Sequence, residues 1–171
     1  ALVLGSQYIT SALFGYGSFN EVAVQNSAKA LYFFALGLPA FSLIKIFSSF
    51  FFANHNTKTP FYISLFSVAL NIIISVYYFK EIGFIIIPIA TSISSWINGI
   101  LLFIFLKKDN LFSFNKEFNF RLIKIIFTSV LMGTLFNFLL IYFKDYLVFE
   151  QNMKSFYLIL SVVISLLFYI F

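Results

Sequence analysis

The fold of this chain is decided by residues 59–106, which read TPFYISLFSVALNIIISVYYFKEIGFIIIPIATSISSWINGILLFIFL. Lys80 and Glu81 divide this stretch into two charge-free runs, 21 residues at 59–79 and 25 residues at 82–106. An α-helix of about 20 apolar residues crosses the ~30 Å hydrocarbon core of a bilayer. The stretch therefore predicts two membrane-spanning helices, and their short connection predicts that they pack as antiparallel neighbours.

The composition of the whole chain of 171 residues also requires a surface that faces lipid. Hydrophobic residues make up 61% of the sequence and charged residues 10%, whereas a soluble domain averages roughly 25% charged residues. The mean hydropathy is +0.99. Because so few charges cannot cover a water-facing surface, most soluble folds are excluded.

The residue types that carry most site chemistry are scarce. The chain has no cysteine and a single histidine, His55, so a disulfide, a thiolate metal site and a histidine cluster are excluded. The net charge is +5, but nucleic-acid binding needs a basic stripe on a soluble face, which the positions of the charges do not provide. We expect no cofactor, no metal, no catalytic residue and no nucleic-acid partner. His55 could sense pH, but its place between two asparagines favours a solvated loop residue.

Three further segments are candidates for spans. Residues 125–143 and 155–171 are charge-free, and residues 27–53 are interrupted by Lys45 and Pro39. Residues 1–19 predict the last turn of a preceding span, a short amphipathic piece at 7–14 and a turn at the following glycines. The expected fold is an all-α, polytopic transmembrane helix bundle of about five full spans plus an N-terminal partial span. Without an initiator methionine, the chain is expected to be a piece of a longer polypeptide.

The basic residues predict the orientation of these spans. If spans alternate strictly, the basic residues divide seven to four between the two sides of the membrane. The larger group is Lys45, Lys58, Lys107, Lys108, Lys116, Arg121 and Lys124, and the smaller group is Lys29, Lys80, Lys144 and Lys154. Positive charge collects on the cytoplasmic side, so the larger group and the C-terminus are expected in the cytoplasm.

Small and polar residues recur at helical spacing within the expected spans. The four stripes are Ser64, Ser67, Asn71 and Ser75; Thr91, Ser95 and Gly99; Ser129, Gly133 and Asn137; and Tyr157, Ser161 and Ser165. Such stripes commonly serve helix packing, because small residues let backbones approach and polar ones bond across the contact. The alternative is that some line a hydrated cavity. Asn71 and Asn98 are then the main candidates, because an amide is costly against lipid.

Two residues complicate the expected span at 27–53. An ionisable side chain inside a span is a functional candidate, but the flexible stem of Lys45 could also reach the cytoplasmic headgroups. Pro39 is expected to kink or hinge its helix, because proline lacks the N–H that the helix needs. Pro88 is expected to do the same in the span at 82–106.

Short motifs along residues 13–98 carry a resemblance to a known family. They are Leu13-Phe14-Gly15-Tyr16-Gly17-Ser18-Phe19, Ala35-Leu36-Gly37-Leu38-Pro39-Ala40-Phe41, Lys45 with residues 51–53, Thr57-Lys58-Thr59-Pro60, Leu70-Asn71, Ala90-Thr91-Ser92-Ile93, and Trp96 with Asn98. In order and spacing they resemble the C-terminal half of the lipid II flippases, the MurJ or MviN family of the multidrug/oligosaccharidyl-lipid/polysaccharide exporter superfamily. Beyond Lys107 only the alternation of spans agrees.

The resemblance implies a transporter, not an enzyme, of the bacterial inner membrane, with a MATE-like fold of two helical lobes followed by two extra helices. Residues 1–19 would end a preceding span, residues 20–107 would form three spans of the C-terminal lobe, and residues 108–171 would form the two extra spans, which line a groove for a lipid tail. Such proteins move undecaprenyl-linked peptidoglycan precursor from the cytoplasmic to the periplasmic leaflet by alternating access. The expected partners are this precursor, membrane lipids and the remainder of the same polypeptide, where the main substrate-binding residues would lie. The candidates for the transport path or for family motifs are Lys45, Lys58, Asn71, Asn98, Pro39 and Pro60.

Three other functions remain open. A related exporter of other polyprenyl-linked oligosaccharides or of small cations has the same architecture. A polyprenyl-phosphate glycosyltransferase needs acidic residues near a membrane face, for which Asp109 and Glu117 in a lysine-rich loop are poor material. A purely structural membrane subunit would lack polar faces that line a cavity.

Overall fold

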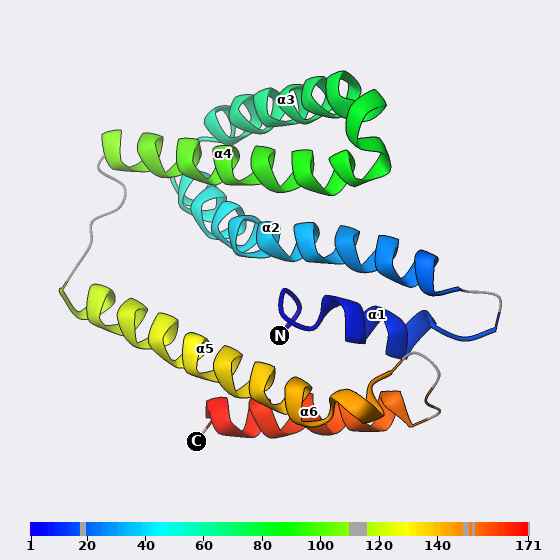
Figure 1. Cartoon of the computed structure of the whole chain (residues 1–171). Helices are drawn as coiled ribbons and strands as arrows, with labels where there is room; N and C mark the ends of the chain where they lie inside the picture. The colour runs from blue at the N-terminus through cyan, green and yellow to red at the C-terminus, as the bar shows by residue number, and fades with distance from the viewer. Residues whose placement is uncertain (18–19, 110–115, 149–150, 152, 171) are drawn as a thin grey trace. The chain divides into compact units, whose positions relative to one another are not determined.

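Helices make up all the regular structure in the part of the chain that the computed structural model describes, which is residues 1–17, 20–109, 116–148, 151 and 153–170. The α-helices are α1 (Ser6–Phe14), α2 (Glu21–Ala53), α3 (Lys58–Ile82), α4 (Ile86–Lys108), α5 (Lys116–Tyr142) and α6 (Lys154–Ile170), and the 3-10 helices are η1 (Gly83–Ile85) and η2 (Lys144–Tyr146) (Figure 1). The all-α class is confirmed.

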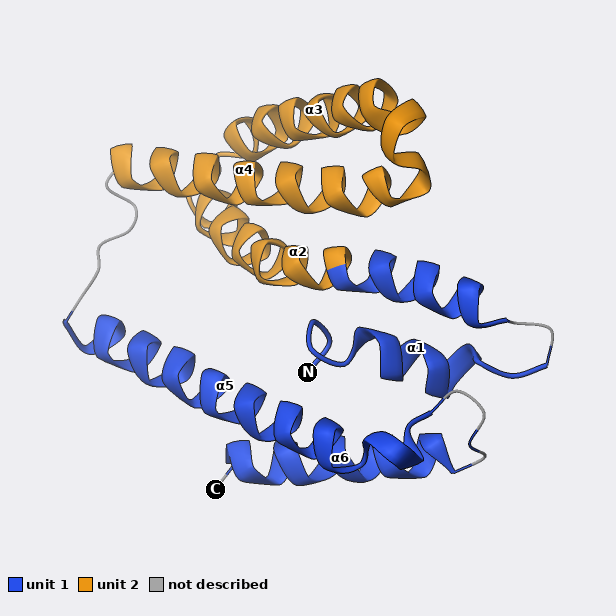
Figure 2. Cartoon of the chain, viewed as in Figure 1, with its two compact units in different colours: residues 1–32, 114–171 blue, residues 33–113 orange. Residues whose placement is uncertain are grey.

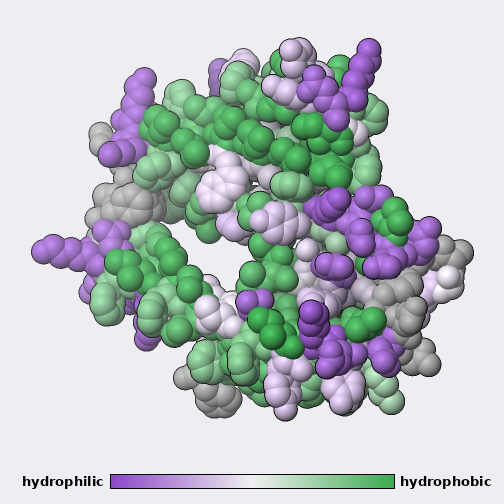
Figure 3. Space-filling model, in the orientation of Figure 1, coloured by the Kyte–Doolittle hydropathy of each residue, from purple (hydrophilic) through white to green (hydrophobic). Residues whose placement is uncertain are grey.

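The long helices have the length and apolarity that a membrane crossing needs. Within the described residues, the stretches Glu21–Ala53, Lys58–Lys108 and Lys116–Tyr142 are long and apolar enough to cross a membrane, and Lys154–Ile170 is a shorter apolar helix. Hydrophobic side chains cover the middle of α3 and α4 on the face shown in Figure 3, and hydrophilic ones gather near the ends of these helices. A polytopic membrane helix bundle is thus confirmed, while the count of five full spans plus a partial one stays a prediction.

Helix boundaries follow the charge-free runs with one difference. The run at 82–106 was expected to be one helix, but Gly83 has a φ of +73° and ends α3, and a 3-10 turn leads into α4 at Ile86. Pro88 consequently stands in the first turn of α4. A residue there has no intrahelical N–H bond to lose, so the expected kink at Pro88 is wrong. Pro39 does lie inside α2, where its missing N–H removes one backbone hydrogen bond to the preceding turn.

The turn between α2 and α3 uses His55 at a position where glycine is usual. His55 has a φ of +56°, the left-handed conformation that often ends a helix. Its N–H donates to the Phe52 carbonyl at 3.0 Å, and the Asn56 N–H donates to the Phe51 carbonyl at 2.9 Å. These two bonds form a Schellman motif, so His55 and Asn56 close the C-terminal end of α2.

Asn56 also opens α3. Its Oδ1 accepts a hydrogen bond from the Thr59 N–H at 3.1 Å, and its Nδ2 donates to the Thr59 Oγ1 at 3.0 Å. One side chain therefore satisfies an orphan N–H of the first turn, as an N-cap does. The C-terminal end of α2 and the N-terminal end of α3 are therefore both closed within a few residues.

The chain divides into two compact units, each with its own core (Figure 2). Unit 2 is residues 33–113, in which α3 and α4 pack side by side against the C-terminal part of α2. Unit 1 is residues 1–32 and 114–171, in which α6 contacts both α1 and α5. The buried core of unit 2 is Phe47, Phe51, Ile63, Leu102 and Leu106, and that of unit 1 is Ala12, Phe136, Leu140, Leu147 and Leu158.

Candidate functional site

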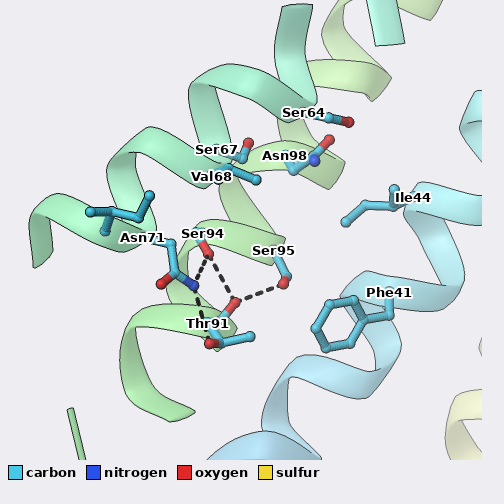
Figure 4. A pocket seen from close by; sticks show the side chains of 11 residues that line it. Phe41, Ile44, Ser64, Ser67, Val68, Asn71, Thr91, Ser94, Ser95 and Asn98 are labelled. Atoms are coloured by element: carbon cyan, nitrogen blue, oxygen red, sulfur yellow. Dashed lines mark hydrogen bonds between the residues drawn. The ribbon is translucent and has the colours of Figure 1, made fainter. Parts of the chain in front are cut away.

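A pocket of about 400 Å³ lies among the three helices of unit 2 (Figure 4). Helix α3 contributes Ser64, Ser67, Val68, Asn71 and Ile72, helix α4 contributes Thr91, Ser94, Ser95 and Asn98, and helix α2 contributes Phe41 and Ile44. The polar stripes expected on α3 and α4 thus face each other, and two apolar side chains of α2 stand opposite them (Figure 4). The pocket therefore has a polar seam, formed by the serine, threonine and asparagine side chains of α3 and α4, and an apolar wall, formed by Phe41 and Ile44 of α2.

Asn71 joins the two polar stripes. Its Nδ2 donates to the Thr91 Oγ1 at 3.1 Å and to the Ser94 Oγ at 3.3 Å, both across the contact between α3 and α4. Its Oδ1 accepts from the Ser75 Oγ at 3.3 Å. The donors of this amide are therefore engaged in holding two helices together, which is the packing role expected of such a stripe.

The hydroxyl groups of the seam are mostly satisfied by their own helices. Ser95 donates to the Thr91 carbonyl at 2.7 Å, and Ser67 donates to the Ile63 carbonyl at 2.9 Å. Bonds of this kind to the preceding turn are common for serine in a helix. Each such oxygen keeps its lone pairs, so the seam presents acceptors to the pocket rather than free donors.

Asn98 differs from Asn71 because its Oδ1 is buried without a hydrogen-bond partner among the described protein atoms. The residue is 93% buried, at 7% relative exposure. A buried acceptor left unsatisfied costs about 1–3 kcal/mol. A hydrogen bond donated to the Asn98 Oδ1 would consequently stabilise a bound group more than one donated elsewhere in the seam.

The middle of α2 is attached to α4 by hydrogen bonds to the α2 backbone. The Trp96 Nε1 donates to the Leu36 carbonyl at 3.0 Å, and the Ser92 Oγ donates to the Phe33 carbonyl. Gly37 provides the room for this approach. Three of the motifs that carried the family resemblance, one on α2 and two on α4, therefore meet in one helix contact.

The other predicted site residues lie outside this pocket. Within the described residues, the pocket lining does not include Lys45, Lys58, Pro39 or Pro60. Lys45 is an exposed residue in the C-terminal half of α2, and Lys58 is an exposed residue at the start of α3. Pro39 is exposed within α2, whereas Pro60 is buried in the first turn of α3.

The two remaining polar stripes differ in their surroundings. Ser161 and Ser165 of α6 are fully buried and donate to carbonyls one turn earlier, at 2.8 and 2.7 Å. Ser129 and Asn137 of α5 are exposed. The α6 stripe thus serves packing, and the α5 stripe faces outward in unit 1.

Sequence analysis missed Lys154. It was expected in a loop between spans, but it is the first residue of α6 and is only 2% exposed. The Lys154 Nζ donates to the Gly15 carbonyl at 2.7 Å. The two residues are separated by most of the chain, so no local pattern in the sequence predicts this contact.

Comparison with known proteins adds an independent finding. The family model described as "Lipid II flippase MurJ" matches residues 1–157. This match continues past residue 98, where the sequence motifs end, through α5 and into α6.

Curated relatives agree with the family model. A probable lipid II flippase MurJ of Rickettsia prowazekii (strain Madrid E) is 33% identical over 149 residues, which cover 87% of this chain and 29% of the relative. Its counterpart in Thermotoga maritima is 38% identical over 129 residues, covering 75% of this chain and 26% of the relative. That of Buchnera aphidicola subsp. Acyrthosiphon pisum is 35% identical over 128 residues, covering 72% and 24%. The chain therefore spans between 24% and 29% of the length of these relatives.

Proposed function

This chain belongs to the lipid II flippase MurJ family, and from that premise we propose that it forms the C-terminal part of a transporter for lipid-linked peptidoglycan precursor. The transporter moves its substrate from the cytoplasmic to the outer leaflet of the bacterial inner membrane by alternating access. The remainder of the same polypeptide supplies the other lobe and most of the substrate-binding residues. The observation that carries this proposal is the family match over residues 1–157.

The physical problem of such a transporter lies in the substrate's headgroup. Sugars and a pyrophosphate cannot cross hydrocarbon, because each unsatisfied polar group costs several kcal/mol there. A bundle with wet inner faces between rocking lobes provides a route. The polar seam around Asn71 and Asn98 supports this role, since it offers acceptors for hydroxyl and amide donors inside an otherwise apolar bundle.

The substrate's isoprenoid tail needs a different surface. On α5 the side chains of Ile123, Phe127 and Val130 are 64%, 63% and 59% exposed. They are apolar and recur at three- and four-residue steps, so they share one face of the helix. We assign the tail to the apolar surface of α5 and α6, because the family resemblance implies that the two extra C-terminal helices line a groove for a lipid tail.

A related exporter of other polyprenyl-linked oligosaccharides is the second candidate, because it would use the same polar seam and apolar helices. A membrane glycosyltransferase is disfavoured. The Glu117 carboxylate lies 3.9 Å from the Arg121 guanidinium, and both side chains are about four-fifths exposed. This is an exposed pair one helical turn apart and not a buried acid prepared for catalysis.

Complementation separates these possibilities. The full-length polypeptide that contains this chain is expressed in a bacterium depleted of its own flippase, with the Thermotoga maritima relative as the positive control. We expect growth and cell shape to be restored. Failure to rescue, with normal membrane insertion and normal protein level, would contradict the assignment to peptidoglycan precursor. Rescue of a strain that lacks an exporter of another polyprenyl-linked oligosaccharide would then favour the second candidate.

A further inference from the structure

The N-terminal end of α6 is fastened to the C-terminal end of α1 by the buried lysine. The Lys154 Nζ donates to the Gly15 carbonyl at 2.7 Å and stands 4.3 Å from the centre of the Tyr16 ring. Lys154 is 98% buried, at 2% relative exposure. A cation over an aromatic face is worth most when it is desolvated.

A second connection runs beside the first. The Ser155 Oγ donates to the Ala12 carbonyl at 2.8 Å. The same Oγ lies 2.7 Å from the Tyr16 hydroxyl. Because serine has a single hydroxyl proton and uses it in the hydrogen bond to the Ala12 carbonyl, Tyr16 is the donor in this pair. Tyr16 therefore contacts both Lys154 and Ser155.

Both connections end at carbonyls that α1 cannot satisfy itself. The last carbonyls of a helix lack intrahelical donors and form the negative end of its dipole. Helix α1 ends at Phe14, so the Ala12 and Gly15 carbonyls belong to this end. The first two residues of α6 supply a cation and a hydroxyl donor to them. Apolar packing continues the contact one turn later, where Leu158 joins Ala12 in the core of unit 1.

Separation of these ends would be costly. It would break the bond between the Lys154 ammonium and the Gly15 carbonyl and would take the Ser155 donor from the Ala12 carbonyl. Breaking a buried charged contact is costly unless water replaces the lost partner. An exposed lysine would not hold two helix ends together in this way, because water competes for its ammonium group.

We propose that Lys154 and Ser155 form a joint that keeps α6 attached to α1 throughout the transport cycle, with Lys154 as a positioning residue for the C-terminal helix pair. This inference rests on the proposed transport function. During transport, the apolar surface of α5 and α6 that we assign to the substrate's tail then moves together with α1 and not independently of it.

A reversible cross-link tests the joint. In the full-length protein, Ala12→Cys and Ser155→Cys are introduced together, because the hydrogen bond between these residues places them within reach of a short thiol-to-thiol reagent. We expect the cross-linked protein to keep at least nine-tenths of the transport of the same protein after reduction. A tenfold loss on cross-linking, recovered on reduction, would overturn the proposal, because α1 and α6 would then have to part during transport.

The role of Lys154 is tested in the same background. Lys154→Met is expected to lower the yield of the cross-link at least threefold at an unchanged protein level in the membrane, and Lys154→Arg is expected to restore most of it. Lys144→Met, the same change at an exposed lysine of unit 1, is the matched control and should leave the yield unchanged. An unaltered yield in Lys154→Met would overturn the proposal. Cross-link yield is read without transport, so this result is independent of whether the complementation succeeds.

Discussion

Gly37 of α2 lies directly against Ser92 of α4. A Cβ built on Gly37 would stand 2.8 Å from the Ser92 Oγ and 3.2 Å from the Ser92 Cα. Rotating the serine hydroxyl cannot relieve the second contact, because Cα belongs to the backbone. Small residues at such crossings let membrane helices approach closely, and this one places Ser92 within reach of the α2 backbone.

Gly37→Ala is therefore expected to destabilise the protein, although alanine is the better helix former. Forcing an extra methyl into a packed contact costs about 1–3 kcal/mol. Thermal unfolding of the purified full-length protein in detergent measures the effect as a lower midpoint temperature.

Gly133→Ala is the control for this prediction. A Cβ there would meet only the Leu4 Cδ1 at 3.6 Å, an ordinary van der Waals distance. Its midpoint should stay at or above that of the unmodified protein. Equal midpoints for the two alanine variants would contradict the prediction, because they would show that α2 and α4 can move apart enough to accept the methyl group.

Asn71→Leu tests the packing role of the polar seam. The change removes two hydrogen bonds between α3 and α4, and interhelical bonds in membranes average about 0.6 kcal/mol each. We expect a loss of stability of about 1 kcal/mol in thermal or denaturant unfolding. Asn137→Leu, at an exposed position on α5, is the matched amide-to-leucine control and should cost nothing. An equal loss in both variants would contradict a specific role for Asn71.

The turn between α2 and α3 predicts opposite effects for two changes at His55. Glycine adopts a positive φ without strain, so His55→Gly should leave stability unchanged or raise it by a few tenths of a kcal/mol. A β-branched residue is disfavoured there, so His55→Val should cost about 1 kcal/mol or more. Unfolding midpoints of the two variants provide the measurement. If His55→Val were more stable than the unmodified protein, the turn would have to adopt another conformation in the membrane.

Lys45→Cys tests whether the lysine within α2 reaches water. If Lys45 faces a cavity, a water-soluble thiol reagent should label the cysteine variant of the full-length protein in at least one transport state. Phe47→Cys, at a buried position two residues later, should remain unlabelled. Absence of labelling at position 45 in every state would mean that Lys45 lies against lipid and extends its amine to the headgroups.

The distribution of lysines predicts the orientation of the chain. A reporter protein fused after residue 171, which lies outside the described residues, should behave as cytoplasmic, because seven of the eleven basic residues then face the cytoplasm. A second fusion in the connection between α3 and α4 should behave as periplasmic. A periplasmic signal at the C-terminus would show that the spans do not alternate as predicted.

Sequence alone determined where the long helices run and what surrounds them. Charge-free runs of bilayer length leave the chain no other way to satisfy its backbone in lipid, so the expected spans at 59–79 and 125–143 correspond to α3 and to the C-terminal two thirds of α5. Helical spacing also placed Asn71 on a polar face, because side chains three or four residues apart share one side of a helix. Both inferences depend on neighbours along the chain.

Only the tertiary structure decided which polar groups are partners. The seam joins α3 to α4 at Asn71, yet the side-chain Oδ1 of Asn98 has no hydrogen-bond partner among the described residues. Lys154 carries the same charge as every other lysine of the sequence, but it is buried because the end of α1, some 139 positions away, presents a carbonyl to it. A residue's type and local spacing say which contacts it is able to make. The contact that forms depends on which distant backbone atoms the folded chain brings within about 3 Å.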